Sequence, residues 1–268
     1  MDIIIQALIL AVIQGLTEFL PVSSSAHLIL PSQLLGWPDQ GQAFDVAVHV
    51  GTLMAVVTYF NHDIRKMVAG MVTGMQTREM NPDLRLAFAV VIGTIPAVVF
   101  GGLFSDFIEE NLRSSFVIAL TTIIFGLLLW ASDRRANTGF DLARMTLMLA
   151  LVIGFAQAIA LIPGTSRSGI TMTAALFLGF SRVSAARFSM LLSIPIIVAA
   201  GTLETIKLAS SGLEVPWNLM ILGILASAFS AFLCIHLFLK LLERIGMTPF
   251  VIYRLLLGAG LLLFIGLN

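Results

Sequence analysis

The sequence contains few cysteines and few charged residues. Its single cysteine, Cys234, excludes an intramolecular disulfide framework and a CxxC metal site. Lys, Arg, Asp and Glu make up 11% of the 268 residues, whereas a soluble domain carries about 25%. The 15 basic and 15 acidic residues cancel, so the chain lacks the basic footprint that nucleic acid binding requires. An ordinary soluble domain is therefore excluded.

Apolar residues fill the sequence instead. They make up 58% of it, and the mean hydropathy is +1.00. The apolar runs reach about 20 residues, the length of a membrane-crossing helix, whereas barrel strands would alternate over roughly 10. We therefore predict an all-α polytopic membrane protein. Its six transmembrane helices are expected at residues 43–60, 86–106, 115–132, 186–207, 217–239 and 249–267, with a polar loop at residues 61–85.

Two polar stretches interrupt the apolar runs, QGLTEFLPVSSSAH at residues 14–27 and QAIALIPGTSRSGIT at residues 157–171. Each has a glutamine on an apolar run, then a proline (Pro21, Pro163), then hydroxyl residues. The apolar arms that follow, at about residues 26–35 and 170–180, are too short to cross a core about 30 Å thick at about 1.5 Å per residue. We therefore predict two re-entrant helical hairpins. Broken backbone at membrane depth needs protein or a wet cavity around it, which indicates a site.

The order of elements repeats within a single membrane domain, residues 1–268. Each half has a hairpin followed by three spans, about residues 1–134 and 145–268, and the tripeptide Phe-Val-Ile opens the third span of each half at residues 116–118 and 250–252. A hairpin returns to its own side and three spans cross over. The two halves are therefore expected to be inverted-topology repeats whose breaks meet near the midplane.

The Lys and Arg residues predict the orientation, because they accumulate on the cytoplasmic side. Arg113 and Lys207 fall on the side of the N-terminus. Both termini are therefore expected outside, and the first hairpin enters from the outer face. Eleven cations fall on the opposite side: Arg65, Lys66, Arg78, Arg85, Arg134, Arg135, Arg144, Arg182, Arg187, Lys240 and Arg244.

The first break carries candidate metal-binding and catalytic residues. Gln14 and Glu18 are four residues apart and share a helix face, so their oxygens could bind a hard divalent cation. An ionisable residue in a membrane helix is a functional hypothesis by default, although Glu18 could also serve only as a structural partner of Arg167. A serine run beside His27 could supply a nucleophile and its base, or simply cap the helix that follows.

The second break carries a candidate phosphate site. Its glycines, Gly164 and Gly169, favour inward-facing backbone amides, and the next helix begins there with free N–H groups that attract anions. Arg167 adds a permanent charge whose geometry suits phosphate oxygens. Asp45 and His49 are four residues apart and could line the same cavity. By contrast, Arg254, His62 and His236 are expected near the membrane interfaces.

The two stretches resemble the paired signature motifs of bacterial undecaprenyl-diphosphate phosphatases of the bacitracin-resistance type. The second, Pro-Gly-X-Ser-Arg-Ser-Gly, is matched in full at residues 163–169, and the resemblance covers essentially the whole chain. It implies hydrolysis of undecaprenyl diphosphate to the monophosphate and inorganic phosphate at the outer face of the bacterial plasma membrane. The lipid carrier would thereby be recycled for peptidoglycan synthesis, with bacitracin resistance as a consequence.

The resemblance also implies roles for individual residues. Glu18 would either bind the metal, Mg²⁺ or Ca²⁺, or activate the nucleophile. The attacking group would be Ser24 or water, and His27 would act as the acid or base. Arg167 would clamp the diphosphate. Gln14 stands where many members have Glu, which weakens the inference that two carboxylates bind the metal. Some relatives have Gln in place of His49, so the role of His49 stays open. The expected substrate-binding residues are Ser23, Ser25, Gly164, Thr165, Ser166, Ser168 and Thr171.

The expected partners are a polyprenyl diphosphate lipid and membrane lipids, with a homodimer as a further option and no nucleic acid. An inverted repeat with broken helices is also the plan of many transporters. A polyprenyl-phosphate flippase is therefore the alternative function. A relative of the soluble acid phosphatases is disfavoured because their motif would place histidine where Thr173 stands.

Overall fold

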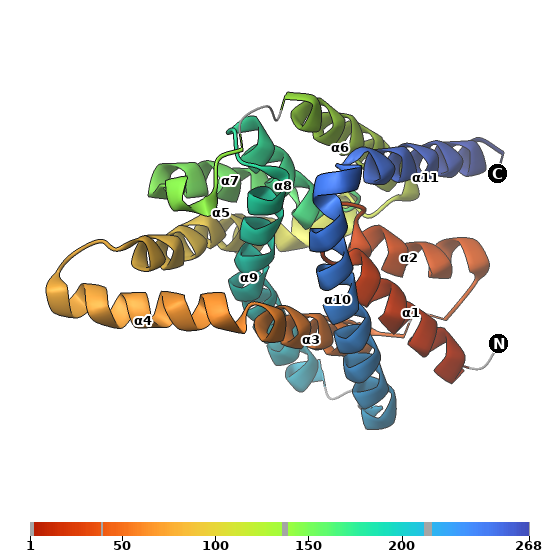
Figure 1. Cartoon of the computed structure of the whole chain (residues 1–268). Coiled ribbons are helices and arrows are strands. Elements are labelled where there is room, and N and C mark those ends of the chain that lie inside the picture. The colour runs from red at the N-terminus through yellow and green to blue at the C-terminus, as the bar shows by residue number, and fades with distance from the viewer. Residues whose placement is uncertain (1–2, 39, 136–138, 212–215, 268) are drawn as a thin grey trace.

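The computed structural model describes residues 3–38, 40–135, 139–211 and 216–267, and these residues are almost entirely helical (Figure 1). The helices are α1 Ile3–Thr17, α2 Ser24–Leu35, α3 Gln42–Tyr59, α4 Asn61–Thr77, α5 Pro82–Asn111, α6 Ser115–Arg135, the 3-10 helix η1 Leu142–Arg144, α7 Leu147–Ile159, α8 Arg167–Phe177, α9 Arg182–Ser211, α10 Trp217–Ile245 and α11 Thr248–Leu267.

The helix lengths confirm a polytopic membrane protein. Within the described residues, five helices are long and apolar enough to cross a bilayer: α5, α6, α9, α10 and α11. A sixth span is formed if α3 and α4 are counted together, across a bend of 73°. The 18 residues of α3 reach about 27 Å at 1.5 Å each, slightly less than the core thickness of about 30 Å. These six positions correspond to the six predicted spans.

The prediction of a polar loop over residues 61–85 is wrong, because residues 61–77 form helix α4. Its charged residues suggested a loop, but apolar residues also recur there at helical spacing. The buried face of α4 contains Met67, Gly70 and Gly74 and packs against the start of α5. Asn81 joins the two helices, since its side chain donates to the Gly70 carbonyl (3.0 Å) and accepts from the Leu84 amide (2.8 Å).

Both predicted hairpins are present as pairs of short helices. The pairs are α1 with α2, of 15 and 12 residues, and α7 with α8, of 13 and 11 residues. The helix α1 packs along α10, and α7 packs along α5. An internal two-fold relation between the halves would produce this pairing. The boundaries and inverted topology of the two repeats stay predictions.

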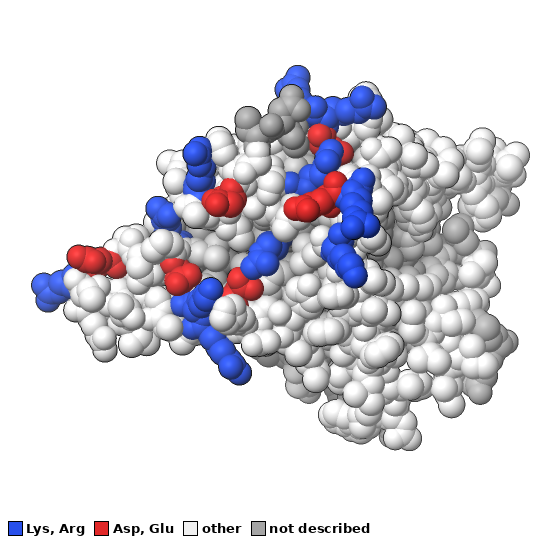
Figure 2. Space-filling model, in the orientation of Figure 1, with Lys and Arg blue, Asp and Glu red and all other residues white. Residues whose placement is uncertain are grey.

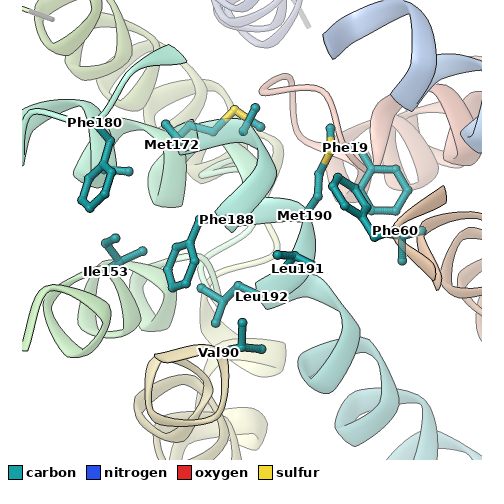
Figure 3. Packing of buried hydrophobic residues seen from close by; sticks show 14 of the residues in the cluster. Phe19, Phe60, Val90, Ile153, Met172, Phe180, Phe188, Met190, Leu191 and Leu192 are labelled. Carbon is teal, nitrogen blue, oxygen red and sulfur yellow. The ribbon is translucent and has the colours of Figure 1, made fainter. Parts of the chain in front are cut away.

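The buried core lies where the two hairpins meet α9. In Figure 3, Phe19 of the first break and Phe60 of the α3–α4 bend lie beside Met190 of α9, and all three side chains are buried. Met172 of α8 and Ile153 of α7 belong to the same cluster. The hairpins are therefore anchored by apolar packing behind the polar residues of their breaks. Many large apolar side chains elsewhere face outward, as expected for helices in lipid.

The charged residues are distributed unevenly over the molecule. Figure 2 shows Lys and Arg side chains gathered over α4 and near the ends of α6 and α10. The first turn of α1 and the last turn of α11 lie on the other side of the molecule in the same view. This distribution agrees with the asymmetry counted along the sequence.

Candidate active site

The two breaks have the same local backbone geometry. Helix α2 begins after Ser23 (φ 74°) and helix α8 begins after Ser166 (φ 69°), both in the left-handed region that non-glycine residues seldom adopt. Each serine hydroxyl lies 3.2 Å from that of the serine two positions later, Ser25 or Ser168. Backbone conformations of this kind cost about 1–3 kcal/mol and concentrate at functional sites. Matching strain at both breaks therefore marks them as the candidate site.

Glu18 lies at the centre of the contacts between the breaks. Its Oε2 accepts hydrogen bonds from Gln14 Nε2 (3.0 Å) and Ser24 Oγ (2.8 Å), and its Oε1 accepts one from Arg167 Nη2 (3.1 Å). The residue is only 8% exposed. A carboxylate with this burial is held in its charged form by hydrogen-bond donors and by a neighbouring cation.

Arg167, in the first turn of α8, contacts both the first break and α9. Besides the ion pair with Glu18, its Nη1 donates to the Ser189 carbonyl of α9 (2.9 Å). Its side chain is 15% exposed. The guanidinium is therefore fixed on one side and still reaches the cavity described below.

Arg254 of α11 connects the two breaks through their backbones. Contrary to the prediction that it lies near an interface, it is fully buried. It donates to the carbonyls of Pro21 (3.3 Å), Gly164 (3.0 Å), Thr165 (3.0 Å) and Thr122 (3.1 Å). Its position in the second turn of the last span gave no sequence signal for this role, because the carbonyls that it binds are left without helix partners only where the helices break.

Two hydroxyl side chains complete this connection. Ser168 Oγ donates to the Leu20 carbonyl of the first break (2.7 Å), and Thr121 Oγ1 of α6 donates to the Pro163 carbonyl of the second (2.7 Å). Backbone N–H and C=O groups that are not hydrogen-bonded within a helix must find partners inside the protein. Together with Arg254, these side chains supply partners to both tips and hold them together.

A cavity of about 770 Å³ lies in front of the breaks. Its lining combines polar side chains, including those of both breaks, with apolar residues of α5 and α9 such as Ala97, Ile196 and Ile197. Asp45 and His49 line it as predicted, whereas Arg113, Gln157 and Glu204 were not predicted as cavity residues. The predicted site residues in its wall are Glu18, Ser23, Ser24, Ser25, Ser166 and Arg167.

The other predicted site residues lie behind this wall. Gln14 is buried beneath Glu18. Gly164 (φ 86°) and Thr165 are buried in the turn, with their carbonyls bound by Arg254. Thr171 is buried, and its hydroxyl bonds Ser189 Oγ (2.7 Å). These residues support the shape of the break.

His27, a predicted catalytic residue, is not among the described residues that line the cavity. Its Nδ1 bonds the Ser23 carbonyl (2.7 Å), and its Nε2 bonds the Tyr253 hydroxyl (2.5 Å) of α11. The two rings are stacked, with centroids 5.6 Å apart. Both ring nitrogens are therefore occupied by protein groups.

The donor set for a divalent cation is small. In the described part of the chain, no group of three or more His, Cys, Asp or Glu residues is placed to hold a metal. The oxygens Gln14 Oε1 and Gln157 Oε1 are, however, buried without a hydrogen-bond partner. The Gln14 amide contacts the Glu18 carboxylate, and an orphaned oxygen beside a carboxylate suits a hard cation that takes its remaining ligands from substrate phosphates and water. The site therefore fits Mg²⁺ or Ca²⁺ as a partial, oxygen-based site.

Comparison with known proteins agrees with this geometry. The sequence profile described as "Bacitracin resistance protein BacA" matches residues 7–260. The chain belongs to this family. The BacA match confirms the resemblance predicted from the two motifs, and it covers both breaks and all spans up to the middle of α11.

Curated relatives of the BacA chain are named "Undecaprenyl-diphosphatase". One from Alcanivorax borkumensis is 62% identical over 257 residues, 96% of this chain and 97% of the relative. Another, from Chromohalobacter salexigens, is 60% identical over 256 residues, 96% of this chain and 97% of the relative. A third, from Hahella chejuensis, is 59% identical over 261 residues, with 97% and 98% covered.

Proposed function

We propose that this protein hydrolyses undecaprenyl diphosphate to undecaprenyl phosphate and inorganic phosphate. The observation that carries the proposal is the ion pair between Glu18 and Arg167, one residue from each break, in the wall of the cavity. The relatives' shared name gives the substrate class. It favours the phosphatase over the flippase alternative.

The second break is suited to hold the diphosphate. Arg167 stands in the first turn of α8, where the helix dipole favours anions. Ser166 Oγ caps the Gly169 amide of this turn (3.1 Å). The Arg167 guanidinium can exchange part of its contact with Glu18 for phosphate oxygens, which it matches in charge and geometry. Positioning and charge neutralisation provide most of the catalysis in phosphoryl transfer. Arg167 is therefore assigned to bind the diphosphate and stabilise its transition state.

The first break is suited to supply the attacking group. Ser24 Oγ lies 2.8 Å from Glu18 Oε2, the arrangement of a hydroxyl beside a base. The attacking group is either this hydroxyl or a water that Glu18 holds. The bond between the terminal phosphorus and the bridging oxygen breaks, and its electron pair leaves on the lipid monophosphate.

The apolar residues that line the cavity suit the lipid tail. Ala97 of α5 faces the cavity from one side, and Ile196 and Ile197 of α9 face it from another. A polyprenyl chain needs no closed pocket, because it can extend between the helices into the bilayer. The headgroup alone then occupies the part of the cavity that the two breaks line.

A divalent cation is part of the proposal. Glu18 with the amide oxygens of Gln14 and Gln157 would hold Mg²⁺ or Ca²⁺, which would neutralise charge on the diphosphate. Treatment with EDTA should remove phosphate release, and addition of Mg²⁺ or Ca²⁺ should restore it. Full activity after chelation and extensive dialysis would refute the cation.

We further propose that the site opens to the outer face of the plasma membrane, with both termini outside. The support is the bias of Lys and Arg toward the opposite side of the chain. Release of the monophosphate at this face would return the carrier lipid to peptidoglycan synthesis. It would also deplete the lipid diphosphate outside the cell, which accounts for bacitracin resistance.

The test is phosphate release from undecaprenyl diphosphate by purified protein in detergent. Arg167→Ala and Glu18→Gln should each lower kcat/KM by about 10²–10⁴, the range for removal of an acid–base or charge-stabilising group. The exposed Arg244→Ala in the last turn of α10 serves as a matched arginine control. Thermal unfolding of each variant checks folding. Unchanged activity in both site variants would refute the assignment, and lipid translocation without phosphate release would favour the flippase.

A further inference from the structure

His49 lies on α3 and lines the cavity, and one of its two ring nitrogens is hydrogen-bonded to the backbone. Its Nδ1 lies 2.7 Å from the Asp45 carbonyl oxygen. A carbonyl can only accept, so Nδ1 carries the hydrogen, and the neutral ring then presents an unprotonated Nε2. The ring is 36% exposed and lines the cavity wall. A hydrogen-bond acceptor is therefore aimed at the site.

The Glu18 carboxylate lies close to this nitrogen and is itself an acceptor. Nε2 of His49 lies 3.9 Å from Oε2 of Glu18, too far for a direct hydrogen bond. Gln14, Ser24 and Arg167 donate to the Glu18 carboxylate, which fills three of its about four acceptor sites. One acceptor site on Glu18 and one on His49 thus remain for a shared donor.

A single water molecule satisfies both acceptors. A water about 2.8 Å from each atom forms a closed triangle with the 3.9 Å separation. It would donate one hydrogen to His49 and the other to Glu18. Its lone pairs would then be free to attack an electrophile in the cavity, whose wall also contains Arg167.

His27 cannot hold a water in this way. Its Nδ1 donates to the Ser23 carbonyl, so its Nε2 accepts, and the Tyr253 hydroxyl already occupies that nitrogen at 2.5 Å. It is also not among the cavity-lining residues of the described chain. Of these two histidines, His49 is the one that can contact a reacting group.

We propose that Glu18 and His49 together hold the water that attacks the terminal phosphorus. The water oxygen forms the new P–O bond, one of its protons passes to the Glu18 carboxylate, and the bridging oxygen leaves with its electron pair on the lipid monophosphate. Ser24 then holds the Glu18 carboxylate and does not form a phosphoserine. This inference rests on the proposed phosphatase activity.

A cation between the two atoms fits the site less well. Mg²⁺ and Ca²⁺ prefer oxygen ligands, and imidazole nitrogen suits transition metals better. Water therefore matches the hydrogen-bond acceptors on either side of this gap. A cation on Glu18 would replace one of the protein donors to the carboxylate.

The test compares His49→Phe, which removes the acceptor, with His49→Gln, whose amide oxygen can accept from a water. At saturating Mg²⁺, His49→Phe should lower kcat about 10- to 100-fold with KM changed less than about 3-fold, the effect of losing a group that acts in the chemical step. His49→Gln should restore part of kcat.

The matched control is His62→Phe, because His62 is exposed on α4. Its kcat and KM should match those of the parent protein. Thermal unfolding monitors folding, and His49→Ala replaces the Phe variant if that variant is unstable.

Three outcomes would overturn the inference while leaving phosphatase activity intact. The first is an unchanged kcat in folded His49→Phe. The second is a His49→Phe variant whose kcat reaches the parent value at saturating Mg²⁺ but which needs far more Mg²⁺ for half-maximal activity, which would make His49 a cation ligand. The third is a labelled phosphoserine at Ser24 trapped by rapid quench during a single turnover of substrate labelled in its terminal phosphate. Absence of phosphate release from the parent protein would instead refute the proposed function itself.

Discussion

At the scale of single residues, Arg254 decides whether the two breaks can stay together. It is the largest fully buried side chain in the described part of the molecule, and it donates to four backbone carbonyls. Lone-pair oxygens from both breaks surround one cation, so the arginine balances local negative charge where the helices end. A buried charge is stable when hydrogen bonds satisfy it on several sides. A side chain that leaves some of these carbonyls without a donor lowers the free energy of unfolding.

We expect Arg254→Lys to unfold more easily than the parent protein. Lysine keeps the charge, but a single ammonium cannot reach the carbonyls of Pro21 and Thr122 together with that of Gly164. Hydrogen bonds to charged groups contribute about 1.5–3 kcal/mol each, so the loss should be about 3 kcal/mol or more. Thermal unfolding in detergent measures this change. The exposed Arg244→Lys should leave the midpoint in place, and an unchanged midpoint in Arg254→Lys would contradict the connecting role.

At the scale of elements, small residues let the hairpins pack against the long helices. On α7, a Cβ at Gly154 would lie 2.5 Å from the Gly93 carbonyl oxygen and 2.9 Å from its Cα, both backbone atoms of α5. Gly15 of α1 makes a similarly close approach to α10, where a Cβ would lie 2.5 Å from the Ser227 carbonyl oxygen. Close approach of backbones is a usual way for helices to associate in lipid. The position of each hairpin therefore depends on its glycine.

Gly154→Ala should push α7 away from α5. The contact is with backbone, which cannot rotate away, so overpacking should cost about 1–3 kcal/mol. Since Gln157 on the same helix lines the cavity, phosphate release should also fall. The control is Gly102→Ala on α5, where an added Cβ would meet no atom within 4 Å, and helix propensity there favours alanine by about 0.5–1 kcal/mol. If the two variants unfold alike, hairpin placement does not depend on Gly154.

The sequence predicted the elements better than the contacts between them. Composition and run length identified the spans, and the prolines with their hydroxyl residues identified both breaks, because these signals are local. Helix α4 was missed since its charges outweighed its helical periodicity. Arg254 and the environment of His27 were missed because their partners, the carbonyls of distant breaks and the Tyr253 hydroxyl, are set by packing. Convergence of Glu18 and Arg167 was expected from the hairpin topology, and they lie 3.1 Å apart.

At the scale of the whole molecule, the position of the cavity relates the site to one side of the membrane. Its wall includes Asp45 and His49 in the first half of α3 and Ile196 to Glu204 in the second half of α9. Because α3 and α9 would run in opposite directions across the bilayer in inverted repeats, these two segments lie at the same membrane face. In the proposed orientation, which the Lys and Arg bias supports, that face is the outer one, where a lipid diphosphate released during wall synthesis would be met.

This orientation predicts opposite labelling of the two ends of α10. The native Cys234 is first changed to serine, which keeps a donor for the Leu16 carbonyl that the thiol contacts at 3.1 Å. In intact cells, a membrane-impermeant maleimide should label Trp217→Cys at the start of α10, whereas Lys240→Cys near its end should react only after permeabilisation. Because α10 is one continuous span, its two ends must give opposite results whichever way it points.

The reverse pattern would mean that the cavity opens to the cytoplasm, so the phosphatase would act on the inner leaflet and the proposed orientation would be wrong. Labelling of both positions in intact cells would instead show that α10 does not cross the bilayer, and the helix order on which the meeting of the two breaks depends would then be lost.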